Sequence, residues 1–196
     1  MNYLAHAYLS FGDEDILAGN IISDFIKGKK KFDFPHRIQF GIDLHRLIDH
    51  FTDDHAATAR AKQFFKPGYG LYAAAFVDVA YDHFLATDEK IFSGNELELF
   101  ASTTYKQLKK SESLFPERFR TLFHYMELQN WLFNYRLTEG IFRSFGGLVH
   151  RAKYMYDPQP ACDAFLEHYE ELKDCYEQFF PELKNFAFKK MKAFAD

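Results

Sequence analysis

The stretch from Gly41 to His55 is the part of the chain that most restricts its fold. Its apolar residues recur close to the 3.6-residue period of an amphipathic helix: Ile42, Leu44, Leu47, Ile48 and Phe51. The same period recurs along the rest of the chain. No run alternates between apolar and polar side chains convincingly enough to predict a sheet. The sequence therefore predicts an all-α protein.

We expect one domain spanning residues 1–196, a multi-helix bundle of roughly nine or ten helices, because no linker, repeat or low-complexity segment divides the chain. Residues 66–70 are predicted to end a helix, and residues 157–160 are predicted to form a loop. Gly146-Gly147 is predicted to mark a kink or a point of close packing. The predicted helical segments are 2–10, 13–28, 35–55 with its continuation 56–65, 71–87, 96–109, 116–126, 129–136, 138–152, 161–180 and 181–194.

Composition excludes several classes of protein. Hydrophobic residues make up 47% of the 196 residues, which favours a sizeable core over disorder. The net charge of −4 argues against nucleic-acid binding over the whole surface. No signal peptide or membrane-spanning run is evident, and Cys162 and Cys175 are typical of reduced thiols. We therefore expect a cytoplasmic location and no membrane partner, while the sequence leaves the oligomeric state open.

Polar side chains that can bind a metal interrupt the apolar helical pattern in four segments of the first 83 residues. Singly, each has an ordinary explanation, such as a core histidine with a satisfied hydrogen bond or a surface pair four residues apart. Together they predict a divalent cation held between helices, which would relieve carboxylate repulsion and fix the imidazole tautomers. The residues are His6, Asp24, His45 with Asp49, and Asp78 with Asp82 and His83.

Mixed histidine and carboxylate ligands suit Mn²⁺, Fe²⁺, Mg²⁺ or Zn²⁺, and the lack of cysteines in the set disfavours a closed structural zinc site. Such an ion would activate water and neutralise a phosphoryl oxygen. The chain contains no Walker A loop, no Rossmann glycine fingerprint and no Gly-x-Ser-x-Gly elbow. A metal-dependent hydrolase is therefore favoured over a nucleotide-binding or serine-hydrolase fold.

Basic residues offer a second set of candidates. Lys27, Lys29, Lys30 and Lys31 form a run that is either a solvated loop, the commoner case, or a landing patch for an acidic partner or a phosphate. Arginine binds phosphate in a forked geometry, which makes Arg46, Arg136 and Arg151 candidate phosphate clamps. From spacing alone, we favour ordinary surface arginines for all three.

Several blocks of residues, in the same order, resemble the acyl-carrier-protein phosphodiesterase family. The first two are Met1-Asn2-Tyr3-Leu4-Ala5-His6 and Leu17-Ala18-Gly19-Asn20 leading to Ser23-Asp24-Phe25-Ile26-Lys27-Gly28. The third runs from Gly41 to Asp53, and the fourth is Asp78-Val79-Ala80-Tyr81-Asp82-His83-Phe84-Leu85. Trp131-Leu132, Tyr135-Arg136 and Gly147 with Arg151 also lie where that family has similar residues.

The resemblance implies an HD-domain-like fold and hydrolysis of the phosphodiester that links 4′-phosphopantetheine to a serine of holo-acyl carrier protein, giving apo-carrier protein. It implies a divalent metal, typically Mn²⁺, with Mg²⁺ or Fe²⁺ as alternatives. The sequence departs from the standard HD pattern, because His45 and Asp49 are separated by one helical turn and Asp82-His83 has the reverse order. HD ligand roles therefore do not transfer one for one.

With that resemblance, the predicted metal ligands are His6, Asp24, His45, Asp49, Asp82 and His83, and the predicted catalytic residues are Asp24, His45, Asp49 and His83. Asp78 is expected to support these ligands without binding the metal itself. Because carrier proteins are acidic, the lysine run and Arg46 are expected to orient the substrate, with Arg136 and Arg151 as further substrate-binding candidates.

Two alternatives stay open at this point. The chain could be an HD-like phosphohydrolase for a small phosphorylated molecule such as a nucleotide, with the same site but no protein substrate. It could instead be a non-catalytic helical module that binds an acidic partner through the lysine run. Nucleotide hydrolysis would distinguish the first alternative, and a lack of bound divalent metal would favour the second.

Overall fold

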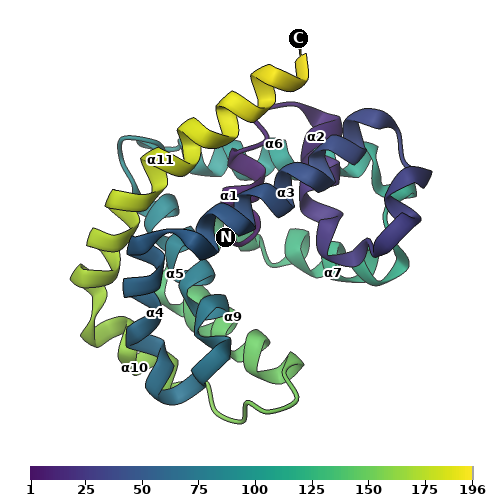
Figure 1. Cartoon of the computed structure of the whole chain (residues 1–196). Coiled ribbons are helices and arrows are strands. Elements are labelled where there is room, and N and C mark those ends of the chain that lie inside the picture. The colour runs from purple at the N-terminus through teal and green to yellow at the C-terminus, as the bar shows by residue number, and fades with distance from the viewer. Residues whose placement is uncertain (196) are drawn as a thin grey trace.

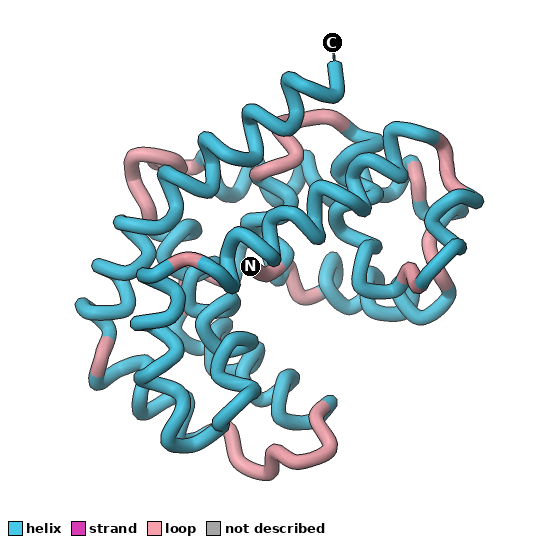
Figure 2. The backbone as a smooth tube through the Cα atoms, in the orientation of Figure 1, coloured by secondary structure: helices cyan, strands magenta, loops and turns pink. Residues whose placement is uncertain are grey.

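The computed structural model describes residues 1–195, and in this range it contains helices but no strand (Figure 2). The prediction of an all-α fold is therefore confirmed. The α-helices are α1 (Tyr3–Tyr8), α2 (Glu14–Ile22), α3 (His36–Asp54), α4 (Ala56–Tyr69), α5 (Ala73–Thr87), α6 (Glu96–Lys110), α7 (Glu117–Leu128), α8 (Trp131–Asn134), α9 (Thr138–Arg151), α10 (Gln159–Glu167) and α11 (Tyr169–Ala195). Short 3-10 helices lie at η1 (Ser23–Phe25), η2 (Gly28–Asp33), η3 (Gly70–Tyr72) and η4 (Glu112–Leu114).

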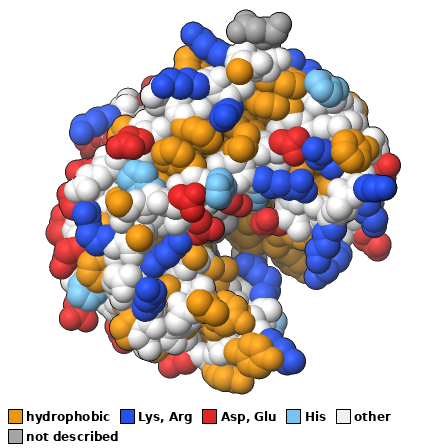
Figure 3. Space-filling view, in the orientation of Figure 1, with side chains coloured by type: hydrophobic (Ala, Val, Ile, Leu, Met, Phe, Trp, Pro, Cys, Tyr) orange, Lys and Arg blue, Asp and Glu red, His pale blue; other side chains and the backbone are white. Residues whose placement is uncertain are grey.

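The helices form a curved molecule with two arms, and the short helix α1 lies between the arms (Figure 1). One arm contains α2, α6 and α7, and the other contains α4, α5, α9 and α10 (Figure 1). The helices α3 and α11 pack together and run from one arm to the other, with α11 along the outer side of the curve (Figure 1). The space-filling view shows this face hollowed between the arms, with acidic and histidine side chains gathered at the inner end of the hollow (Figure 3).

The helices α2 and α3 approach each other unusually closely, and two glycines make this possible. A Cβ atom at Gly19 would overlap with the carbonyl oxygen of Ile38, and one at Gly41 would overlap with that of Ile16. Any larger residue at either position would push the helices apart. This crossing sets the position of Asn20 against the middle of α3.

One continuous hydrophobic core joins the two arms. Helix α5 lies at its centre, with apolar residues on all sides, as expected for a fully enclosed helix. The buried residues of α5 include Phe76, Val77, Tyr81, Phe84 and Leu85. None of the described helices is both long enough and apolar enough to cross a membrane.

The helix predicted over 13–28 ends earlier, at Ile22, and the short 3-10 helix η1 follows it. Two predicted breaks at prolines were also wrong. Helix α4 continues through Pro67 to Tyr69, although a break was predicted from residue 66 onwards. Helix α11 runs through Pro181, and the break instead falls at His168, between α10 and α11. An internal proline removes one backbone hydrogen bond, and the apolar face of α11 on either side of Pro181 is buried well enough to offset that loss.

Candidate metal centre

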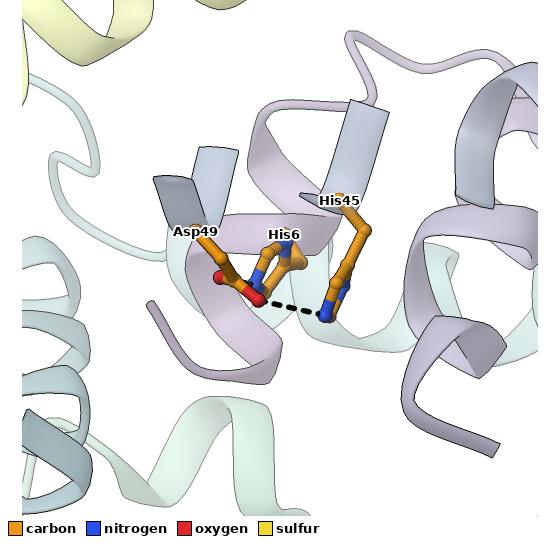
Figure 4. A group of neighbouring side chains, drawn as sticks. All are labelled: His6, His45 and Asp49. Carbon is orange, nitrogen blue, oxygen red and sulfur yellow. Dashed lines mark ion pairs between the residues drawn. The ribbon is translucent and has the colours of Figure 1, made fainter. Parts of the chain in front are cut away.

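The side chains of His6, His45 and Asp49 converge from two helices (Figure 4). The two imidazole rings stack with their centroids 3.9 Å apart and their planes 15° from parallel. His6 Nε2 lies 3.2 Å from Asp49 Oδ1, and His45 Nε2 lies 3.0 Å from Asp49 Oδ2. Both imidazole Nε2 atoms thus face the same carboxylate.

The local sequence explains why these three groups meet. His45 and Asp49 are one helical turn apart on α3, so their side chains lie on the same face. His6 lies on the buried side of the short helix α1. Asp82, on α5, holds the start of that helix by accepting backbone N–H bonds from Asn2, Leu4 and Ala5 at 3.2, 2.7 and 3.3 Å.

A single buried residue, Asn20, orients both imidazoles. Its side-chain oxygen accepts from His6 Nδ1 at 2.8 Å, and its backbone oxygen accepts from His45 Nδ1 at 2.7 Å. Its side-chain NH₂ donates to the His6 carbonyl oxygen, which fixes the orientation of the amide. Because both Nδ1 atoms donate, the neutral form of each ring carries its electron pair on Nε2, the atom that faces Asp49.

The charges of the cluster follow from burial and from these contacts. Burial and the neighbouring His45 lower the pKa of His6 to about 4. Burial also disfavours charge on His45, but hydrogen bonds with Asp24 and Asp49 outweigh it and raise the pKa of His45 to about 9. Burial likewise opposes ionisation of Asp49, yet His6 and His45 hold the pKa of that carboxyl well below its usual range. At neutral pH the metal-free cluster therefore pairs a neutral His6 and a protonated His45 with an ionised Asp49.

These residues fit a divalent cation. Each of the three offers one ligand atom, and these atoms all lie within 4.8 Å of one another. His6 Nε2 and Asp49 Oδ1 are both buried, and neither has a hydrogen-bond partner of good geometry among the described residues. A cation would satisfy both atoms, and the mixture of imidazole and carboxylate donors suits Mn²⁺, Fe²⁺ or Zn²⁺.

Asp24 is the fourth predicted residue that the structure brings to this cluster. It lies on η1, directly after α2, and its Oδ1 is 3.2 Å from His45 Nε2. The hydrogen bond from His45 is the main cause that lowers the pKa of Asp24. Its side chain is 69% exposed, against 40% for Asp49, so Asp24 lies on the solvent side of the cluster.

The α-amino group of Met1 lies on the buried side of the cluster, a position that the sequence alone does not predict. It lies 3.5 Å from Asp49 Oδ1 and 2.9 Å from Asp78 Oδ1. The Met1 amino group thus links Asp78 to Asp49, and the supporting role expected of Asp78 stays a prediction. Burial opposes charge on the amine, but Asp78 and Asp49 raise its pKa to about 10.

The structure does not bring Asp82 and His83 to the cluster, so the prediction that they complete the cation's shell needs correction. The three backbone N–H bonds at the start of α1 occupy the Asp82 carboxylate. His83 Nδ1 lies 2.8 Å from the Tyr135 carbonyl oxygen, and its Nε2 lies 2.9 Å from the Tyr169 hydroxyl. Neighbouring residues on a helix point about 100° apart, which explains why Asp82 faces α1 while His83 faces Tyr169.

The predicted basic residues occupy different surroundings. Lys27, Lys29 and Lys30 are exposed on or beside η2, which follows Asp24 in the chain. Lys31 instead forms an ion pair with Asp43, with Nζ–O distances of 2.7 and 2.8 Å. Arg46 lies beside Asp43 and donates to the Ile26 carbonyl oxygen.

The two remaining arginines lie farther along the chain. Arg136 places its guanidinium 4.1 Å from the Phe133 ring centroid, which is a cation–π contact. Arg151 lines a pocket between α1, α8 and α9.

Comparison with known proteins adds evidence of a different kind. A family model described as "Acyl carrier protein phosphodiesterase" matches residues 1–183. A protein of that name from Klebsiella pneumoniae is 30% identical over 188 residues, covering 95% of this chain and 97% of the relative. Proteins of the same name from Escherichia coli O6:H1 and Photorhabdus laumondii are 30% and 28% identical over 198 and 182 residues.

The alignment with the Escherichia coli protein covers 97% of this chain and 99% of the relative, and that with the Photorhabdus protein covers 92% of each. No solved structure matches the chain significantly. The family model covers far more than half of the residues. The chain therefore belongs to the acyl carrier protein phosphodiesterase family.

Proposed function

We propose that this protein is a metal-dependent phosphodiesterase that removes 4′-phosphopantetheine from holo-acyl carrier protein and leaves apo-carrier protein. Membership of the family supports the reaction. The observation that supports the metal dependence is the convergence of His6 Nε2, His45 Nε2 and the Asp49 carboxylate. Two of these atoms, His6 Nε2 and Asp49 Oδ1, are buried without a hydrogen bond of good geometry among the described residues.

His6, His45 and Asp49 would hold the cation, which we propose to be Mn²⁺, with Mg²⁺ or Fe²⁺ as alternatives. When bound, such an ion lowers the pKa of a coordinated water and neutralises charge on a phosphoryl oxygen. Asn20 keeps the two imidazoles in the tautomer that ligation requires. The buried side of the cluster is closed by the Met1 amino group and Asp78.

Asp24 is our proposed proton acceptor. It is ionised, it hydrogen-bonds His45, and it is the most exposed carboxylate of the cluster. In the proposed reaction, the oxygen of a water molecule bonds to phosphorus and the bond from phosphorus to the serine oxygen breaks. Asp24 takes one proton from the water and passes it to the serine oxygen, which leaves as a hydroxyl.

The exposed lysines Lys27, Lys29 and Lys30 form the proposed docking patch for the acidic carrier protein. They follow Asp24 closely in the chain, so a carrier bound there would have its modified serine near the cluster. Lys31 contributes less to this patch because Asp43 neutralises it. Opposite charges across such an interface steer association and set orientation, and their effect weakens as salt screens them.

The patch is tested by reversing all three charges, Lys27→Glu, Lys29→Glu and Lys30→Glu. The matched control reverses three exposed lysines near the end of α11, Lys189, Lys190 and Lys192. We expect the first variant to lower kcat/KM for holo-carrier protein at low salt by about tenfold or more, with little change in the control. Equal activity of the two variants at low salt would rule out the patch.

The reaction itself is tested by incubating the protein with holo-carrier protein and Mn²⁺ and following the mass of the carrier. We expect loss of the prosthetic group with the wild type and with His50→Ala, whose side chain is 77% exposed, but not with Asp49→Asn. Hydrolysis of nucleotides without action on the carrier would favour the small-molecule alternative. Binding of the carrier with neither bound metal nor hydrolysis would favour the binding module.

We propose a cytoplasmic location for this reaction. The described chain has two cysteines, Cys162 and Cys175, and both are buried free thiols. Proteins of reducing compartments keep such thiols unpaired.

A further inference from the structure

A pocket of about 630 Å³, its mouth included, opens between α1, α8 and α9. Its wall includes Asn2, the N-cap of α1, and Tyr3, which lies three residues before His6 on that helix. The Tyr3 ring packs against Trp131 with the ring centroids 6.4 Å apart. None of the residues assigned above to the cation lines the pocket.

Tyr3 lines the pocket and lies about one helical turn before His6 on α1, so it connects this pocket to the cluster. Burial is the main cause that raises the pKa of the Tyr3 hydroxyl, Asp24 raises it further, and Arg151 opposes both. The charge of Asp24, from the solvent side of the cluster, and the charge of Arg151, from the pocket, therefore both act on this hydroxyl. A ligand that starts at the cluster and passes Tyr3 would enter the pocket beside Arg151.

The lining of the pocket combines two chemistries. Val79, Trp131 and Leu148 offer apolar surface, whereas Asn2, Gln129 and Asn134 offer carboxamides. Trp131 Nε1 and the Asn134 amide each donate to Gln129, which orders this polar side. Such a lining suits a ligand that alternates aliphatic groups with amides. It suits a purely aliphatic chain poorly, because such a chain would cover the carboxamides of the pocket without offering them hydrogen bonds.

Small residues on one face of α9 leave room for the pocket. Gly140, Ser144 and Gly147 all line the pocket and recur at helical spacing. A Cβ atom at Gly147 would meet only the Arg151 guanidinium, at an ordinary contact distance of 3.7 Å. A large side chain at this position would therefore extend into the pocket without disturbing the backbone.

We propose that this pocket binds the pantetheine arm of the substrate, an inference that rests on the proposed function. The arm leaves the phosphate as a linear chain with a dimethyl-substituted carbon, two amides and a terminal thiol. The dimethyl carbon packs on Trp131 and Leu148, and the amides pair with the carboxamides of Asn2, Gln129 and Asn134. Arg151 also lines the pocket, and its positive charge attracts the phosphate.

This pocket explains how the enzyme would distinguish holo-carrier protein from phosphoserine or a simple alkyl phosphodiester. The phosphate alone offers no apolar surface and no amide. Binding energy from the arm, a part of the substrate that does not react, positions the phosphodiester at the cluster.

The first test fills the pocket with Gly147→Leu and uses Gly146→Leu as the matched control. The Cβ position of Gly146 has nothing within 4 Å, and this residue does not line the pocket. With Mn²⁺ present, we expect Gly147→Leu to weaken 4′-phosphopantetheine binding by tenfold or more in calorimetry. Inorganic phosphate and Mn²⁺ should bind both variants as they bind the wild type.

The second test needs no variant, because Trp131 is the only tryptophan in the chain and lines the pocket. We expect its fluorescence in the wild type to change when 4′-phosphopantetheine binds and to stay constant with inorganic phosphate. Constant fluorescence at a concentration where calorimetry shows 4′-phosphopantetheine bound would overturn the inference.

Failure of the inference and failure of the proposed function give different results. If the wild type hydrolyses holo-carrier protein and Gly147→Leu does so with the same kcat and KM, the pocket assignment is wrong and the function stands. If the wild type binds Mn²⁺ but neither hydrolyses the carrier nor binds 4′-phosphopantetheine, both are wrong.

Discussion

At the scale of single residues, the cluster depends on Asn20 as much as on the groups that would touch a cation. Asn20 is fully buried and bonds both His6 and His45, one through its side chain and the other through its backbone. A side chain can be replaced, but the backbone contact remains. The two histidines should therefore respond unequally to substitution of Asn20, and His6 should lose its partner while His45 keeps it.

Removing a ligand should abolish tight metal binding without unfolding the protein. We expect His6→Ala to weaken Mn²⁺ binding by about 100-fold or more, because outer partners of a ligand alone are worth about 10–100-fold. His50→Ala is the matched control, since His50 adjoins Asp49 in sequence but is exposed. Calorimetric titration with Mn²⁺ measures both variants, and equal affinities would exclude His6 as a ligand.

Mn²⁺ binding should release protons. The pKa of His45 is raised to about 9, so this imidazole is protonated at pH 7 and must lose its proton to become a ligand, whereas His6, with a pKa of about 4, is already neutral. We expect about one proton per Mn²⁺ and an apparent affinity that falls about tenfold for each pH unit between 8 and 6. Titration in two buffers of different ionisation enthalpy measures the proton count. A count of zero would contradict the proposed role of His45.

Much of this residue-scale picture could be predicted from the sequence. Spacing identified His45 and Asp49 as neighbours on one face, and His6 and Asp24 as unusual polar residues in apolar segments. The sequence could not show that Asp82 and His83 point to different partners, because spacing on one helix says nothing about which helix packs against each face. The role of Asn20 was hidden for a similar reason, since one of its two contacts uses a backbone oxygen.

At the scale of elements, the crossing of α2 and α3 is what places the cluster. The glycines at 19 and 41 allow the approach, and the crossing brings Asn20 to within 2.7 Å of His45 Nδ1. Both glycines lie in blocks that resemble the family, so the pattern was visible in the sequence. The sequence could not show why glycine is needed at these positions, because a close approach depends on the relative position of two helices.

Gly41→Ala should force the two helices apart. We expect a loss of about 1–3 kcal/mol or more in the free energy of unfolding, together with weaker Mn²⁺ binding. Gly146→Ala has open space around its Cβ position and lies inside a helix, so it should keep Mn²⁺ affinity and gain up to about 1 kcal/mol. Urea denaturation gives both values. If Gly41→Ala were as stable as the wild type, the close crossing would be wrong.

The two errors at prolines share one cause. Prolines at residues 67 and 181 predict the end of a helix, but both helices continue. A proline inside a helix costs about 3 kcal/mol relative to alanine. Burial of apolar side chains on both sides of the proline outweighs that cost, and only the tertiary structure shows how much surface is buried.

At the scale of the whole molecule, the cluster lies where α1 meets α3, and α1 lies between the two arms (Figure 1). The continuous core that joins the arms is made of apolar side chains and includes none of the cluster's side chains, so the fold should form without metal. The metal should then add stability by binding the folded state alone. At a Mn²⁺ concentration of about 100 times Kd this amounts to about 2.7 kcal/mol.

We therefore expect Mn²⁺ to raise the melting temperature of the wild type by about 5–10 °C, given about 2–4 °C per kcal/mol for a chain of this size. Removal of the metal with EDTA should reverse the shift and leave a folded protein. His6→Ala should show little shift. Thermal scans followed by circular dichroism measure all three, and an unfolded protein after EDTA treatment would show that the metal is instead required for the fold.

The most direct test of the central claim is the mass of holo-acyl carrier protein incubated with the protein and Mn²⁺. We predict that the carrier loses the mass of 4′-phosphopantetheine with the wild type and with His50→Ala, and that it keeps this mass with Asp49→Asn or after EDTA. A carrier that keeps its prosthetic group under every divalent metal tested would contradict the proposed function. Equal loss with Asp49→Asn would contradict the assignment of the site.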